Sequence, residues 1–225
     1  MSAHLYLLRY HFRLGIGWAA LVPPLGLAAL LAGLSAFAAP AERAHNLGVG
    51  LGTCLPLLAA LLAAPLLLAE REQGTLVWLA TRRSLGGVLA ARLALLGVYL
   101  LLLTGATILI AALLWRGPWS WSALPYVAVP ALAFAALSSL AAAVGRSSVH
   151  GYICAVALWL GALVLIGVLP ASDVWRPLEP FAWSFGFSRS VVAHSALLYS
   201  AIGALLLLAQ WRILRHPERL LGPGA

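Results

Sequence analysis

The sequence predicts an all-α integral membrane protein with six transmembrane helices. Of its 225 residues, 63% are hydrophobic and only 9% are charged, against about 25% charged in an ordinary soluble domain. A soluble domain of this length could not hide so much apolar surface in one core and still present a polar surface to water. The apolar residues also fall in runs of about 20, the length that crosses the hydrocarbon core of a bilayer.

Six apolar segments have this length, and we expect them to form one transmembrane domain over residues 1–225. They are residues 15–39, 48–69, 93–115, 121–144, 149–169 and 194–211. Each break between them carries an arginine, a proline or both, as in "RGP" and "GRSS". The first segment is longer than the apolar core of a signal peptide, about 7–15 residues, so we expect it to be retained.

Ahead of the first span, residues 3–14 are expected to form an interfacial helix. Leu5, Leu8 and Phe12 share one helical face, and Arg9 lies on another. Such a helix lies in the headgroup layer, with its arginines toward the phosphates. A cytoplasmic extension of the first span explains the same periodicity and stays open as an alternative.

The stretch "EREQGTLVWLATRR" at residues 70–83 separates the second span from the third and contains five charged residues. Gly74 can break a helix and Thr75 can cap a new one. The apolar "LVWLA" between the charges is badly placed in water, so we expect it to be buried. Either the headgroup layer or a groove on a partner protein would bury it.

Residues 170–193 form the longest connection between spans and are expected to be external. Three prolines interrupt this connection, and its five Trp and Phe residues are of the kind that gathers at membrane interfaces. Backbone that is not helical enters a membrane only where protein or water satisfies its hydrogen bonds. We therefore expect short helices that lie in the outer leaflet or dip into it.

Arginines predict the orientation, because cytoplasmic loops are enriched in basic residues. All 14 basic residues are arginine, and ten of them flank the spans on one side against four on the other. The four are Arg43, Arg116, Arg176 and Arg189. Both termini are then cytoplasmic, which agrees with the requirement that an even number of spans places them on the same side. We expect the protein in the inner (plasma) membrane.

Several kinds of chemistry are disfavoured by the sequence. The arginines are scattered singly or in pairs, which argues against a nucleic-acid-binding face. No P-loop is present, and the chain has no lysine to complete one. Cys54 and Cys154 lie within apolar runs and the six histidines are dispersed, so we expect no disulfide, metal site or cofactor in this chain. The apolar runs contain no interior Asp, Glu or Arg, which argues against an ion-coupled transporter.

An intramembrane hydrolase is the alternative from the enzyme class. It requires a serine nucleophile and a histidine base within hydrogen-bonding reach. The available residues are Ser138, Ser139, Ser147, His150 and His194, but "GRSSVHG" is not a G-x-S-x-G elbow. A membrane scaffold that transports nothing is a further alternative.

The order of elements resembles the permease subunits of ABC-2 type transporters. Their common pattern after the second span reads approximately E-R-E-x-G-T-L-x-x-L-L-x-x-P, followed by Gly-Lys further on. This chain lacks the proline and the Gly-Lys pair, with Arg92 near the place of the lysine. The matching residues are Glu70, Arg71, Glu72, Gly74, Thr75, Leu76 and Leu79.

The resemblance implies an exporter subunit that dimerises with a second permease copy or a homologue. A separate ATPase subunit, which binds ATP and Mg²⁺, would dock on the cytoplasmic side, and membrane lipids would surround the spans. Residues 70–86 would then be the coupling segment, seated in a cleft of the ATPase. The residues implied in this contact are Glu70, Arg71, Glu72, Gly74, Thr75, Leu76, Trp78, Leu79, Arg82 and Arg83.

Overall fold

The computed structural model describes residues 25–26, 29–30, 33, 36–66, 68, 85–115, 124–166, 175–182 and 184–214. Within these residues the chain forms helices and short turns, without a β-strand. The long helices are α3 (Pro40–Ala63), α6 (Leu85–Trp115), α7 (Leu124–Gly145), α8 (Ser148–Leu165) and α9 (Arg189–Leu214), and a short 3₁₀ helix, η3 (Arg176–Leu178), lies between α8 and α9.

Each of the five long helices in this described part is long and apolar enough to cross a membrane. The predicted all-helical membrane protein is therefore confirmed for the described residues. The first expected span is described only at a few positions between residues 25 and 39, and the expected helix at residues 3–14 lies outside the described residues.

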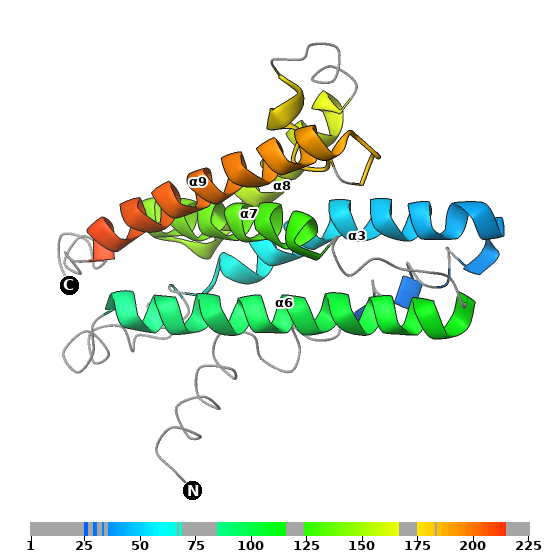
Figure 1. Ribbon diagram of the computed structural model, residues 1–225. Helices are drawn as coiled ribbons and strands as arrows, with labels where there is room; N and C mark the ends of the chain where they lie inside the picture. The colour runs from blue at the N-terminus through cyan, green and yellow to red at the C-terminus, as the bar shows by residue number, and fades with distance from the viewer. Residues whose placement is uncertain are drawn as a thin grey trace, which may run out of the picture.

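Successive helices alternate in direction (Figure 1). At one end of the bundle α3 ends, α6 begins, α7 turns into α8 and α9 ends; we call this the junction end. At the other end, the η3 end, α3 and α9 begin and η3 packs against α9. This arrangement places Arg92, Arg146 and Arg212 near the junction end and Arg43 and Arg189 near the η3 end, the same two groups into which the sequence divides them.

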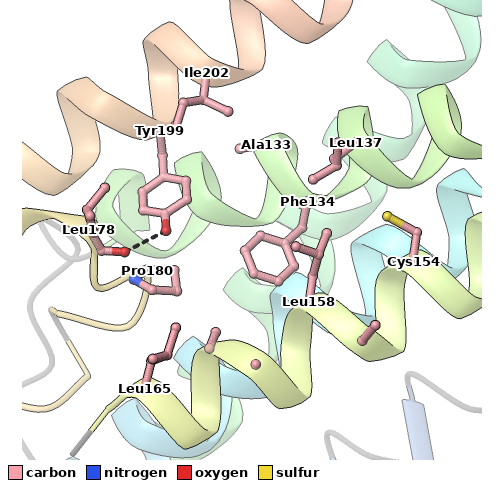
Figure 2. A pocket seen from close by; sticks show the side chains of 13 residues that line it. Ala133, Phe134, Leu137, Cys154, Leu158, Leu165, Leu178, Pro180, Tyr199 and Ile202 are labelled. Atoms are coloured by element: carbon pink, nitrogen blue, oxygen red, sulfur yellow. Dashed lines mark hydrogen bonds between the residues drawn. The ribbon is translucent and has the colours of Figure 1, made fainter. Parts of the chain in front are cut away.

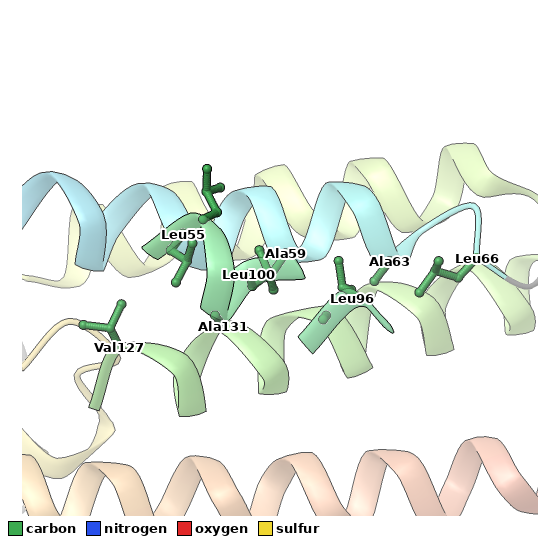
Figure 3. Packing of buried hydrophobic residues seen from close by; sticks show 10 residues of the cluster. Leu55, Ala59, Ala63, Leu66, Leu96, Leu100, Val127 and Ala131 are labelled. Atoms are coloured by element: carbon green, nitrogen blue, oxygen red, sulfur yellow. The ribbon is translucent and has the colours of Figure 1, made fainter. Parts of the chain in front are cut away.

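Helices α3 and α7 form the centre of the bundle. Buried residues make up 56% and 61% of their membrane-length stretches, against 17% in both α8 and α9. The buried face of α7 consists largely of alanine and serine, small residues that let two helices approach closely. Figure 3 shows the main cluster, in which α3, α6 and α7 meet through Leu55, Ala59, Leu96 and Ala131.

Several helices begin earlier than the apolar runs in the sequence. The polar stretch "PAERAHN" lies inside α3, because Pro40 occupies the first helical turn and Glu42 adds a favourable negative charge there. Helix α6 begins at Leu85 and α9 at Arg189, before the expected spans at 93 and 194. The turn between α7 and α8 is tight: Arg146 has a φ of 55°, and the Ser147 hydroxyl accepts a hydrogen bond from the Val149 N–H at 3.3 Å.

Candidate functional site

The predicted coupling residues lie outside the residues that the structure describes. They are Glu70, Arg71, Glu72, Gly74, Thr75, Leu76, Trp78, Leu79, Arg82 and Arg83. The structure does describe the two helices that hold this segment. Helix α3 ends at Ala63 and is followed by a turn over residues 64–66, and α6 begins at Leu85. The two points at which the segment is attached, the end of α3 and the start of α6, both lie at the junction end.

Arg92 joins these two attachment points. Its side chain is 1% exposed, and its Nη1 donates a hydrogen bond to the backbone carbonyl of Leu66, beyond the end of α3. That carbonyl has left the helical ladder, so a donor from α6 satisfies a group that would be costly to bury alone. Leu66 and Leu96 pack in the main cluster on the same side. The ends of α3 and α6 are therefore held together at the point where the predicted coupling segment departs.

Arg92 also departs from its expected place at the mouth of the third span. Because α6 begins at Leu85, Arg92 lies two turns inside the helix and within its membrane-length stretch. The apolar run at residues 93–115 contains no charge, but helix α6 extends back beyond this run and therefore includes the charged Arg92. Charged groups at such positions are expensive and are kept paired with other groups.

A second polar centre lies at the η3 end, in the connection between α8 and α9. Glu179 is fully buried, and its Oε1 accepts a hydrogen bond from the Phe181 N–H at 3.1 Å. Two hydroxyls of α9 fix the backbone here: Ser195 donates to the Glu179 carbonyl at 2.9 Å and Tyr199 to the Leu178 carbonyl at 2.7 Å. Burial raises the pKa of the Glu179 carboxyl above its ordinary value, and the Phe181 N–H lowers it by less.

The same connection packs against α3. A methyl group on Gly52 would overlap the Ser184 hydroxyl and lie 2.9 Å from the Ser184 Cβ. Ser184, Phe181 and Ala182 are buried, and the rings of Phe181 and Phe134 are tilted with centroids 6.5 Å apart. Residues 179–182 and 184 of the 170–193 connection are therefore part of the bundle's core, and the last residues of the connection already belong to α9.

Helices α8 and α9 both pack on α7 but make few contacts with each other. Between them lies a partly open cavity of about 580 Å³, which we call the α8/α9 groove (Figure 2). Its only described hydroxyl, that of Tyr199, already donates to Leu178. The lining residues are Ala133, Phe134, Leu137, Cys154, Ala157, Leu158, Gly161, Ala162, Leu165, Leu178, Pro180, Tyr199 and Ile202.

The serines considered for hydrolysis make contacts between helices or within turns. Ser138 on α7 donates to the Gly151 carbonyl on α8 at 3.0 Å, and Ser139 lies 3.3 Å from the Gln210 Oε1 on α9. Ser147 caps α8. His194, at the opposite end of the bundle, makes a 2.7 Å contact from Nδ1 to the Ser190 carbonyl. The structure thus places Ser147 and His194 at opposite ends, whereas His150 lies near Ser147, with its backbone N–H donating to the Ser147 carbonyl at 3.1 Å.

Comparisons with protein-family models, with curated proteins and with solved structures find no match. The class that the structure itself defines is a helical, membrane-embedded protein with a buried arginine at the junction end and an apolar groove between α8 and α9.

Proposed function

We propose that this chain is the transmembrane subunit of an ABC-2 type exporter, with six spans and both termini in the cytoplasm, driven by a separate ATPase. The observation that carries the proposal is the sequence E-R-E-x-G-T-L directly after the second span in a chain without a P-loop. This sequence implies an element that docks on another protein and receives motion from it.

The junction between α3 and α6 supports this proposal mechanically. A push on residues 70–84 reaches the bundle through two helix ends that Arg92 and Leu66 hold together. Helix α3 is also packed extensively on α7, and packed helices move as rigid bodies instead of deforming continuously. Displacement of the coupling segment would therefore move α3 and α6 jointly.

The contacts of the serines favour this proposal over the hydrolase alternative. The hydroxyls of Ser138 and Ser139 are used in contacts from α7 to α8 and α9, which is the ordinary use of serine in membrane helices.

The test is co-purification of the ATPase from the native host with the wild-type chain and with Glu72→Arg. We expect an ATPase to co-purify with the wild type. Inverting a charge at the rim of the docking contact should weaken its binding by about tenfold, or about 1.4 kcal/mol. Gly74→Pro should have a similar effect by changing the backbone at the start of the docking helix.

The matched control is Arg189→Glu, which inverts an exposed charge at the η3 end of the bundle. It should leave ATPase binding unchanged, and all variants should unfold at the wild-type temperature. If no ATPase co-purifies, or if Glu72→Arg and Gly74→Pro bind it as well as the wild type, the proposal is wrong.

A further inference from the structure

The α8/α9 groove is a preformed cavity between membrane-length helices. At about 580 Å³, it falls within the range of roughly 300–1,000 Å³ typical of small-molecule sites. It is lined almost entirely by carbon, and its one described hydroxyl is already hydrogen-bonded within the protein. An occupant therefore gains by burying apolar surface and needs no polar partner along the groove.

The dimensions of the groove correspond to one leaflet of a bilayer. Its lining residues on α8 run from Cys154 to Leu165, about 16 Å along the axis at about 1.5 Å per residue. This is roughly half of the ~30 Å hydrocarbon core. The groove reaches Leu178 and Pro180 at the η3 end, where α8 ends and α9 has begun. A single extended hydrocarbon chain entering from that end would fill it.

The charges at the η3 end complement an anionic headgroup. The described residues between 175 and 190 carry two arginines, Arg176 and Arg189, and one acid, Glu179. Because Glu179 is fully buried, the exposed surface of this segment is basic. Arginine is well suited to phosphate groups.

We propose that the α8/α9 groove binds one acyl chain of an anionic phospholipid, with the phosphate at the η3 end. This inference is independent of the exporter proposal, because a structural lipid needs no transport. The lipid would fill the gap between α8 and α9, which both pack on α7 but leave part of its surface uncovered. Other conceivable occupants, such as the first span or a second copy of the chain, are separated by the experiment below.

Gly161 provides a variant that fills the groove with little strain. A Cβ at this position has nothing within 4 Å, so Gly161→Phe can extend its ring into the cavity. Gly105 on α6 is the matched control, since its Cβ position is equally open but it does not line the groove. Gly105→Phe therefore adds the same side chain elsewhere.

The first measurement is native mass spectrometry of the full chain after equilibration with phosphatidylglycerol vesicles and delipidation in detergent. We expect one phospholipid retained per chain in the wild type and in Gly105→Phe. Retention should fall by about tenfold in Gly161→Phe, which corresponds to about 1.4 kcal/mol. Equal retention in Gly161→Phe overturns the site, and equal retention of phosphatidylethanolamine overturns the anionic assignment.

The second measurement needs no variant. Phosphatidylglycerol with a photoreactive acyl chain, presented in vesicles, should form adducts on lining residues of α8 and α9 such as Leu158 and Ile202. Adducts distributed evenly over the exposed faces of α6 overturn the proposal. So does a crosslink from the Cys154 thiol to residues 15–39 or to a second copy of the chain, because either protein segment would then occupy the groove.

Discussion

Glu179 is an acidic side chain that the fold removes entirely from solvent. Its Oε1 is hydrogen-bonded to the Phe181 N–H, whereas its Oε2 has no hydrogen-bond partner among the described residues. Among the described residues, the Tyr199 side chain interacts with it electrostatically. Burial therefore favours the protonated carboxyl, and its pKa lies above the ordinary value.

This raised pKa predicts that stability falls as the pH rises. Below about pH 4.3, the ordinary pKa of glutamate, both the folded and the unfolded states are protonated at this site. Between that pH and the raised pKa of Glu179, the unfolded state loses its proton first, so the free energy of unfolding decreases. The thermal unfolding temperature of the wild type, measured in detergent, should therefore fall as the pH rises through this range.

Glu179→Gln should remove the contribution of this site, because the amide keeps the acceptor for Phe181 and does not titrate. We expect the variant to match the wild type at the acidic end and to be more stable at higher pH. An unchanged pH slope in Glu179→Gln would show that another group causes it.

At the scale of elements, the connection between α8 and α9 is held by three contacts from two helices. Ser195 and Tyr199 fix its backbone from α9, and Gly52 on α3 leaves room for Ser184. The Gly52 contact joins parts of the chain far apart in sequence. It therefore determines how closely the connection approaches the centre of the bundle.

Gly52→Ala should destabilise the protein by about 1–3 kcal/mol, as expected when a methyl group is forced into a packed site. Ser184→Gly in the same chain should recover much of this loss, because it removes the atoms that the methyl group would meet. A double-mutant cycle measured by thermal unfolding gives the coupling energy. Gly161→Ala is the control, with open space at its Cβ; simple additivity of the two changes would contradict a direct contact.

The sequence predicts the helices well but their ends poorly. Apolar runs mark where a chain meets hydrocarbon, whereas a helix ends where its backbone hydrogen bonds end. Pro40 and Glu42 read as a loop in the sequence, yet they suit a first helical turn and belong to α3. For the same reason Arg92, placed at a helix mouth by the sequence, lies buried two turns inside α6.

The polar contacts of the interior could not be predicted from local pattern. Glu179 stands in a proline-rich, aromatic connection, and nothing near it in sequence indicates that Ser195 and Tyr199 on α9 enclose its backbone. Trp159 likewise donates to the Thr53 carbonyl at 2.7 Å across 106 positions. Such pairs arise from tertiary packing, which periodicity does not encode. The α8/α9 groove could not be predicted either, because it depends on how far apart α8 and α9 lie in the folded bundle.

At the scale of the whole molecule, the number of crossings determines the side on which the N-terminus lies. The five described helices alternate in direction, so residue 40 and the end of α9 lie at opposite ends of the bundle. If residues 15–39 also cross the membrane, the N-terminus joins the C-terminus at the junction end. If they do not cross, the two termini are on opposite sides.

Arginine distribution predicts the first arrangement, with both termini cytoplasmic. In a variant lacking both native cysteines, we expect Ala3→Cys, Arg146→Cys and Gly222→Cys to react with a membrane-impermeant maleimide only after the cells are permeabilised. Arg189→Cys, at the η3 end, should react in intact cells and serves as the control for labelling from outside. Labelling of Ala3→Cys in intact cells, with Gly222→Cys protected, would mean five crossings and would remove the sixth span on which the exporter proposal depends.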